Sequence, residues 1–146
     1  MKNPLRSPEE YELFVYTLAE QFPSILHSTI TFVRRGKSLA RVAGELIFDQ
    51  EIRLIVRERI LFDRLPGIID WYGYEIWRGQ EKLYWYDSQP HPHQPDLQST
   101  YPHHKHVPPN VKHNRIPAMT TFTRPNFDFL IREIEAMLKK TEPGVE

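Results

Sequence analysis

Near the start of this 146-residue chain, apolar side chains follow the spacing of an amphipathic helix. They are Tyr11, Phe14, Val15 and Leu18. Ser7 and Pro8 precede this run in the manner of a helix cap, and Phe22-Pro23 ends it. The pattern therefore predicts an N-terminal helix within residues 1–23.

From residue 25 to residue 87, apolar and polar side chains alternate, as expected of strands with one buried face. The connections between the alternating runs are short, and this favours an antiparallel meander over parallel strands with crossovers. The pattern predicts a sheet of about five strands. Glu58 shares its face of the third strand with Val56 and Ile60, so the alternation places this carboxyl group in the core.

Residues 88–124 show neither the helical spacing nor the strand alternation of apolar side chains. Eight of the thirteen prolines lie between Pro90 and Pro125, a density that forbids a regular helix or an interior strand. We expect a long His/Pro-rich loop laid over the sheet, with disorder as the alternative. Helical spacing returns in residues 125–140, which predict a C-terminal helix, capped by Thr123 or Asn126. The chain is thus expected to be a single α+β domain over residues 1–146.

Composition narrows the classes of function. The chain has no cysteine, which excludes disulfides, thiolate metal sites and cysteine nucleophiles and fits a cytoplasmic location. The first residues lack the apolar stretch of a secretory signal, and no apolar run is long enough to span a membrane. Nineteen basic residues balance nineteen acidic ones, so overall charge gives no sign of nucleic-acid binding.

Histidine is concentrated in the His/Pro-rich loop, where six of the seven histidines fall between His91 and His113. Imidazole titrates near neutral pH and is a frequent metal ligand, so the cluster indicates proton transfer or metal binding. A set formed by His91, His93, His103 and His106 would suit zinc or another divalent metal. Histidines that only hydrogen-bond backbone carbonyls are the structural alternative.

Two further features could carry chemistry. A buried Glu58 would need either a cationic partner or a pKa raised by burial, and a raised pKa would suit a general acid or base. Seven aromatic residues lie between Trp71 and Tyr86, where they could stack on nucleic-acid bases or simply pack across strands. Of these, Tyr72 and Tyr74 are expected to be the more exposed pair.

Two segments together resemble a known family. They are Trp85-Tyr86-Asp87-Ser88-Gln89-Pro90-His91 and Tyr101-Pro102-His103-His104-Lys105-His106. The first is similar to an aromatic strand that ends in Asp and a Pro-His pair, and the second to the Pro-His-His-Lys-His box of the TumE-type toxins of prokaryotic toxin–antitoxin modules. The resemblance implies a toxin that is held by a cognate antitoxin protein.

The leading hypothesis is a metal-independent endoribonuclease that needs no cofactor and acts by general acid–base catalysis on RNA. The expected catalytic residues are His104 or His106 as acid, Glu58 or His91 as base, and Lys105 and Arg57 as charge stabilisers. Tyr74 is expected to position or stack a base. The remaining predicted substrate contacts are Tyr72, Arg59, His103 and Asp87.

This hypothesis requires the loop histidines to meet Glu58 and the neighbouring arginines in one cleft. The alternatives are a histidine-ligated metalloprotein and a non-catalytic module that binds RNA or protein. An open edge of the sheet would allow a homodimer in each case.

Overall fold

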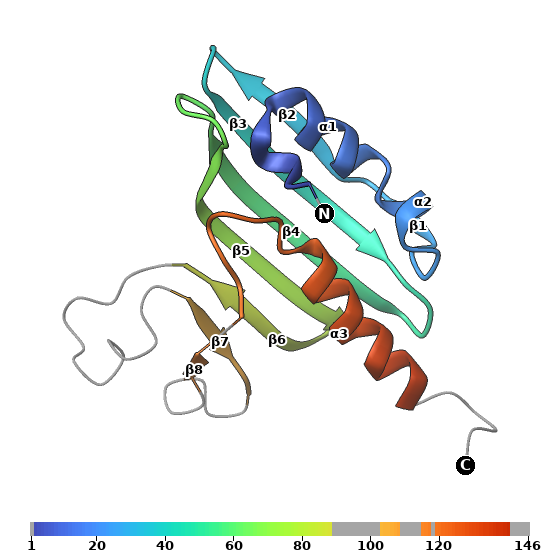
Figure 1. Ribbon diagram of the computed structural model, residues 1–146. Coiled ribbons are helices and arrows are strands. Elements are labelled where there is room, and N and C mark those ends of the chain that lie inside the picture. Colours follow the sequence, from blue (N-terminus) through green and yellow to red (C-terminus); the bar gives the residue numbers. More distant parts are fainter. Residues whose placement is uncertain (1, 89–102, 109–114, 118, 141–146) are drawn as a thin grey trace.

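The computed structural model describes residues 2–88, 103–108, 115–117 and 119–140 (Figure 1). Within these residues one antiparallel sheet contains eight strands, with β2 paired to β3 beside the path β1-β3-β4-β5-β6-β7-β8. The strands are β1 (His27–Ser28), β2 (Thr31–Arg35), β3 (Leu39–Ile47), β4 (Ile52–Leu61), β5 (Ile68–Arg78), β6 (Glu81–Asp87), β7 (His104–His106) and β8 (Arg115–Pro117). The predicted α+β class with an antiparallel sheet and helices at both ends of the chain is confirmed.

The predicted N-terminal helix is divided into a 3-10 turn, η1 (Pro4–Arg6), and two helices, α1 (Pro8–Tyr16) and α2 (Leu18–Gln21). Ser7 caps α1 as expected, because its hydroxyl accepts a hydrogen bond from the backbone N–H of Glu10. The C-terminal helix is α3 (Phe127–Lys140). No helix in the described part of the chain is both long and apolar enough to cross a membrane.

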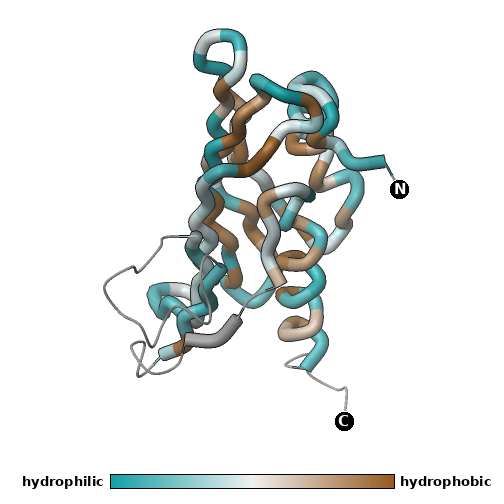
Figure 2. Tube along the Cα trace, turned by 60° about the vertical axis from the view of Figure 1, so that its left-hand side comes forward, coloured by the Kyte–Doolittle hydropathy of each residue, from teal (hydrophilic) through white to brown (hydrophobic). Residues whose placement is uncertain are grey.

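All helices of the described chain lie on one face of the sheet, as Figures 1 and 2 show from two directions. The apolar side chains of this helix-covered face form the core with the inward faces of α1 and α3. Along β4 the buried positions alternate strictly from Ile52 to Ile60, with Glu58 among them. The opposite face, which no described helix covers, is called the open face below.

Gly44 marks the point along β3 where its pairing changes from β2 to β1. It has a φ of +143°, and a Cβ atom there would lie 2.6 Å from the carbonyl oxygen of Thr29. β1 pairs with the end of β3 beyond Gly44, and β2 pairs with the part before it. Glycine therefore allows both segments to follow the same edge of β3.

Two expectations about the surface of the sheet are wrong. Tyr72 and Tyr74 are fully buried rather than exposed, because their alternation places them on the helix-covered face with Glu58, the Cα partner of Tyr72. The His/Pro-rich loop also contributes two short strands, β7 and β8, and β7 lies inside the sheet between β6 and β8. The strand His104–His106 contains no proline, so nothing in it prevents pairing.

Candidate functional site

A row of cross-strand partners on the open face brings together several residues whose side chains could take part in catalysis. Arg57 on β4 pairs with Gly73 on β5, which pairs with Asp87 on β6, which pairs with His104 on β7. Partners in register point to the same face of a sheet. His106 lies two residues beyond His104 and therefore shares this face.

Asp87 lies between the two imidazoles. Its Oδ2 atom is 3.0 Å from Nε2 of His106, and its Oδ1 atom is 3.5 Å from Nδ1 of His104. The two imidazole side chains are 0% and 5% exposed, whereas the Asp87 side chain is 24% exposed. Asp87 is therefore the most accessible residue of the Asp87–His104–His106 cluster.

The charges in this cluster determine the protonation of Asp87. Burial raises the pKa of Asp87, but the neighbouring His106 and His104 lower it more, so its pKa lies below the ordinary value. Asp87 is consequently ionised near neutral pH. An ionised carboxylate between two imidazoles stabilises a positive charge on either ring.

A hollow of about 200 Å³ adjoins the cluster, and Asp87, Gly73 and Arg57 are among its lining residues. A Cβ atom at Gly73 would lie 3.6 Å from the Trp71 ring, which also lines the hollow. Arg57 donates to Glu75, with 2.9 Å between its Nη2 and the carboxylate oxygen Oε2. The volume is below the range of about 300–1,000 Å³ that is usual for ligand pockets, and it has room for part of a nucleotide.

Aromatic side chains hold the cluster in place. The ring of His106 stacks on Trp85 with 5.1 Å between centroids and an interplanar angle of 12°. Nζ of Lys82 lies 4.0 Å from the centre of the same indole ring. The indole therefore packs between strand neighbours and fixes the orientation of the His106 imidazole.

Lys105 does not lie where the acid–base hypothesis requires it. It alternates with His104 and His106 and so points to the helix-covered face. There its Nζ atom is 3.1 Å from Oε2 of Glu133 on α3 and 4.5 Å from the centre of the Tyr84 ring. Lys105 therefore attaches β7 to α3, and its expected role as a charge stabiliser in catalysis is wrong.

Glu58 is buried as expected, but not together with the cluster. Tyr11 and Tyr74 both donate their hydroxyl protons to its carboxylate, and Asn126 Nδ2 donates to the Tyr74 hydroxyl over 2.9 Å. Burial raises the pKa of Glu58 to about 7, although the hydrogen bonds from Tyr74 and Tyr11 oppose this shift.

The shared cleft expected for Glu58 with His104 and His106 is therefore wrong. Arg57 and Glu58 are neighbours in one strand and point to opposite faces, and only Arg57 shares the face of Asp87. No cation pairs with Glu58 in the described part of the chain. Asn126 directly precedes α3, where its carbonyl accepts from the Leu130 N–H, and its side chain bonds to Tyr74 and to the backbone of Thr121.

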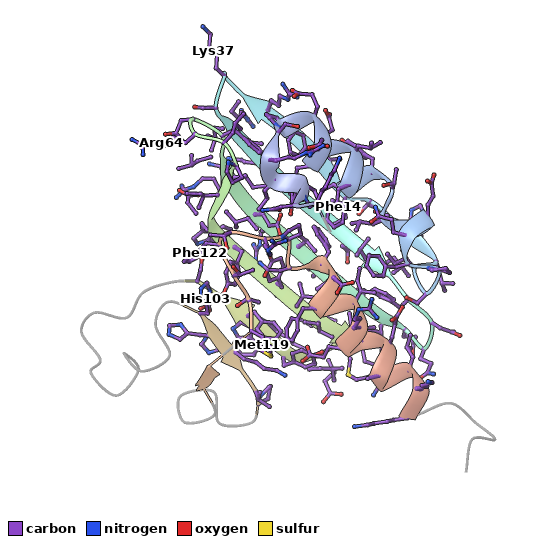
Figure 3. The ribbon with its side chains drawn as sticks, in the orientation of Figure 1. Phe14, Lys37, Arg64, His103, Met119 and Phe122 are labelled. Atoms are coloured by element: carbon purple, nitrogen blue, oxygen red, sulfur yellow. The ribbon has the colours of Figure 1, made fainter. Side chains whose placement is uncertain are left out.

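His103 lies on the same face as Glu58. Its Nδ1 atom is 2.7 Å from the Tyr72 hydroxyl, and its ring contacts that of Phe122, as Figure 3 shows. Burial lowers the pKa of His103, and the charge of His104 lowers it further. His103 and His106 thus lie on opposite faces of the sheet, and the expected metal set that includes both is wrong. His91 and His93 lie outside the described residues.

The other expected substrate contacts are divided between the faces. Arg59 lies on the open face, where it pairs with Asp70 over 2.8 Å and has Trp71 as its cross-strand partner. Trp71 lines the hollow. Tyr72 and Tyr74 lie on the buried face and cannot stack on an external base. Trp71 and the central position of Asp87 were not predicted from the sequence, although the alternation of β5 and β6 could have indicated both.

A larger hollow lies elsewhere in the described part of the molecule. It has a volume of about 690 Å³ and lies between α3 and the segments around Ser24 and Gln50. Ser24 donates to Glu135 there, and no histidine lines it. Its carboxylates, Asp49 and Glu135, have no imidazole beside them in the lining, so the cluster on the open face is the better candidate site.

A family model described as toxin TumE matches residues 15–139, which include the whole cluster and both elements that hold it. No curated protein and no solved structure shows a significant match to the chain.

Proposed function

The chain belongs to the TumE family of toxins, and from this premise we propose that it is an RNA-cleaving toxin whose reaction centre is Asp87–His104–His106. The observation that supports this proposal most strongly is the position of Asp87. This carboxylate contacts two imidazoles on one side and lines a hollow that contains an arginine on the other. A toxin family also implies, in general, an antitoxin that binds the toxin.

The proposed reaction is an intramolecular transesterification of an RNA phosphodiester, and it needs no metal ion. One imidazole removes the proton of a ribose 2′-hydroxyl, whose oxygen attacks the adjacent phosphorus. The other imidazole donates a proton to the leaving 5′-oxygen, so a 2′,3′-cyclic phosphate and a 5′-hydroxyl end are formed. Asp87 stabilises whichever ring is positively charged, and Arg57 stabilises the extra charge on the phosphate.

The open face supplies a surface for single-stranded RNA. Arg41 and Arg59 are cross-strand partners on this face, and Trp71 follows in the same row. Arginines on such a face contact phosphates, and an indole stacks on a base without regard to sequence. We assign to Trp71 the stacking role that the sequence analysis gave to Tyr74.

The proposal is tested by incubating the purified protein with a single-stranded RNA and with a DNA of the same sequence, both in the presence of a chelator. We expect the RNA to be cut with a 2′,3′-cyclic phosphate end, and the DNA to remain intact because it lacks the 2′-hydroxyl. Cleavage of both polymers, or of neither, would show that the proposed reaction is wrong.

A further inference from the structure

The Asp87–His104–His106 cluster has the composition of a metal site. Each residue offers one ligand atom, and these atoms all lie within 4.8 Å of one another. Two imidazole nitrogens and one carboxylate oxygen are ligands of zinc and of other late first-row divalent ions, whereas magnesium and calcium prefer oxygen ligands alone. This set differs from the four histidines expected from the sequence.

The distances within the cluster also fit a small cation. Ligands about 2.0–2.1 Å from a tetrahedral zinc ion are separated by about 3.3 Å from each other. The carboxylate oxygens of Asp87 lie 3.0 Å from His106 Nε2 and 3.5 Å from His104 Nδ1. The three ligand atoms lie within 4.8 Å of one another, so a single ion contacts all of them once the side chains draw closer together.

The hydrogen bonding of the cluster provides a second, independent indication. Nε2 of His106 is buried, and no acceptor among the described residues is aligned with it for a hydrogen bond, although Asp87 Oδ2 is close. Buried polar atoms normally have a well-aligned partner, and an ion bound between the two side chains would supply one. The Asp87 oxygen Oδ1, which faces His104, is in the same state within the described chain.

The surroundings support the ligands in this role. Stacking on Trp85 fixes the orientation of the His106 ring. The nearest cation in the row is Arg57, and its charge is offset by the ion pair with Glu75. Asp87 also lines the hollow on the open face.

We propose that Asp87, His104 and His106 form a binding site for a divalent transition-metal ion of the zinc class. Each imidazole binds such an ion through the nitrogen lone pair that proton transfer also requires. On the basis of the proposed function, the bound ion therefore inhibits RNA cleavage.

The test is a titration of the protein, without a histidine tag and after chelator treatment, with Zn²⁺ in a calorimeter. We expect one high-affinity equivalent for the unmodified chain, and an affinity at least about 10-fold lower for His106→Ala and for Asp87→Asn. His103→Ala is the matched control, since this residue of the same box lies on the opposite face, and it should bind as the unmodified chain does. Circular dichroism verifies that each variant is folded.

The metal site is refuted if the unmodified chain binds no zinc, or if the two cluster variants bind it as tightly as His103→Ala does. RNA cleavage in the same samples reports separately on the proposed function. If zinc binds at the cluster and is required for cleavage, the metal site stands and the metal-free reaction is wrong.

Discussion

His106→Ala is expected to reduce the rate of RNA cleavage by about 10²–10⁴-fold, the usual contribution of a catalytic acid or base. The variant loses the imidazole that lies 3.0 Å from Asp87 and leaves Trp85 without its stacking partner. His104→Ala should have an effect of the same order, because the reaction requires one group to accept a proton and another to donate one. The measurement is the initial rate of cleavage of a labelled single-stranded RNA.

Lys105→Ala is the matched control, because Lys105 lies between the two histidines in β7 and points to the other face. This variant loses an ion pair and an aromatic contact, so it should be less stable by about 1 kcal/mol. Its rate of cleavage, measured well below its melting temperature, should equal that of the unmodified chain. A folded Lys105→Ala protein as slow as His106→Ala would contradict the assignment of the reaction to the open face.

Glu58→Gln is expected to remove a large pH dependence of stability. The pKa of Glu58 is about 7 in the folded state, against 4.5 for the ordinary side chain. The folded state therefore binds more protons between these values, and the stability that protonated Glu58 contributes decreases as the pH rises through 7. Relative to Glu58→Gln, the unmodified chain should lose about 2–3 kcal/mol of stability between pH 5 and pH 8.

The measurement is urea unfolding of both proteins at several pH values, with the difference in unfolding free energy plotted against pH. Glu20→Gln serves as the control, since Glu20 is exposed on α2 and its replacement should leave the curve of the unmodified chain unchanged. Parallel curves for Glu58→Gln and the unmodified chain would show that the carboxyl group is not held protonated by burial.

The elements that depend on local periodicity could be predicted from the sequence. Apolar spacing and the Ser7 cap indicate α1, and strict alternation indicates β4 and places Glu58 in the core. The Pro-His-His-Lys-His box was also sufficient to indicate the family, which the match over residues 15–139 confirms. These properties require only residues that are close together in the chain.

Which residues meet in the site depends on the pairing register of strands that are distant in the chain. The sequence does not reveal this register. The pairing of β6 with β7 decides that Asp87 meets His104 and His106, across a separation of many residues. Alternation within β7 was available from the sequence, and it separates Lys105 from both histidines. The high proline content around this segment argues against a strand, and β7 was therefore not predicted.

The same property of strands explains why Glu58 and the histidines were wrongly placed together. Arg57 and Glu58 are adjacent in sequence but lie on opposite faces, so a hypothesis that used both in one cleft could not hold. Aromatic residues show the same division. Tyr72 and Tyr74 are buried with Glu58, while Trp71 faces the hollow on the open face.

The most direct test of the account compares RNA cleavage by Asp87→Asn and Glu58→Gln in the presence of a chelator, at a pH where both variants are folded. Asp87 lies at the centre of the proposed reaction centre, whereas Glu58 is enclosed in the core behind the sheet. We predict that Asp87→Asn loses cleavage by about 100-fold or more, while Glu58→Gln cleaves at the rate of the unmodified chain. Retained cleavage in Asp87→Asn together with its loss in folded Glu58→Gln would contradict the account.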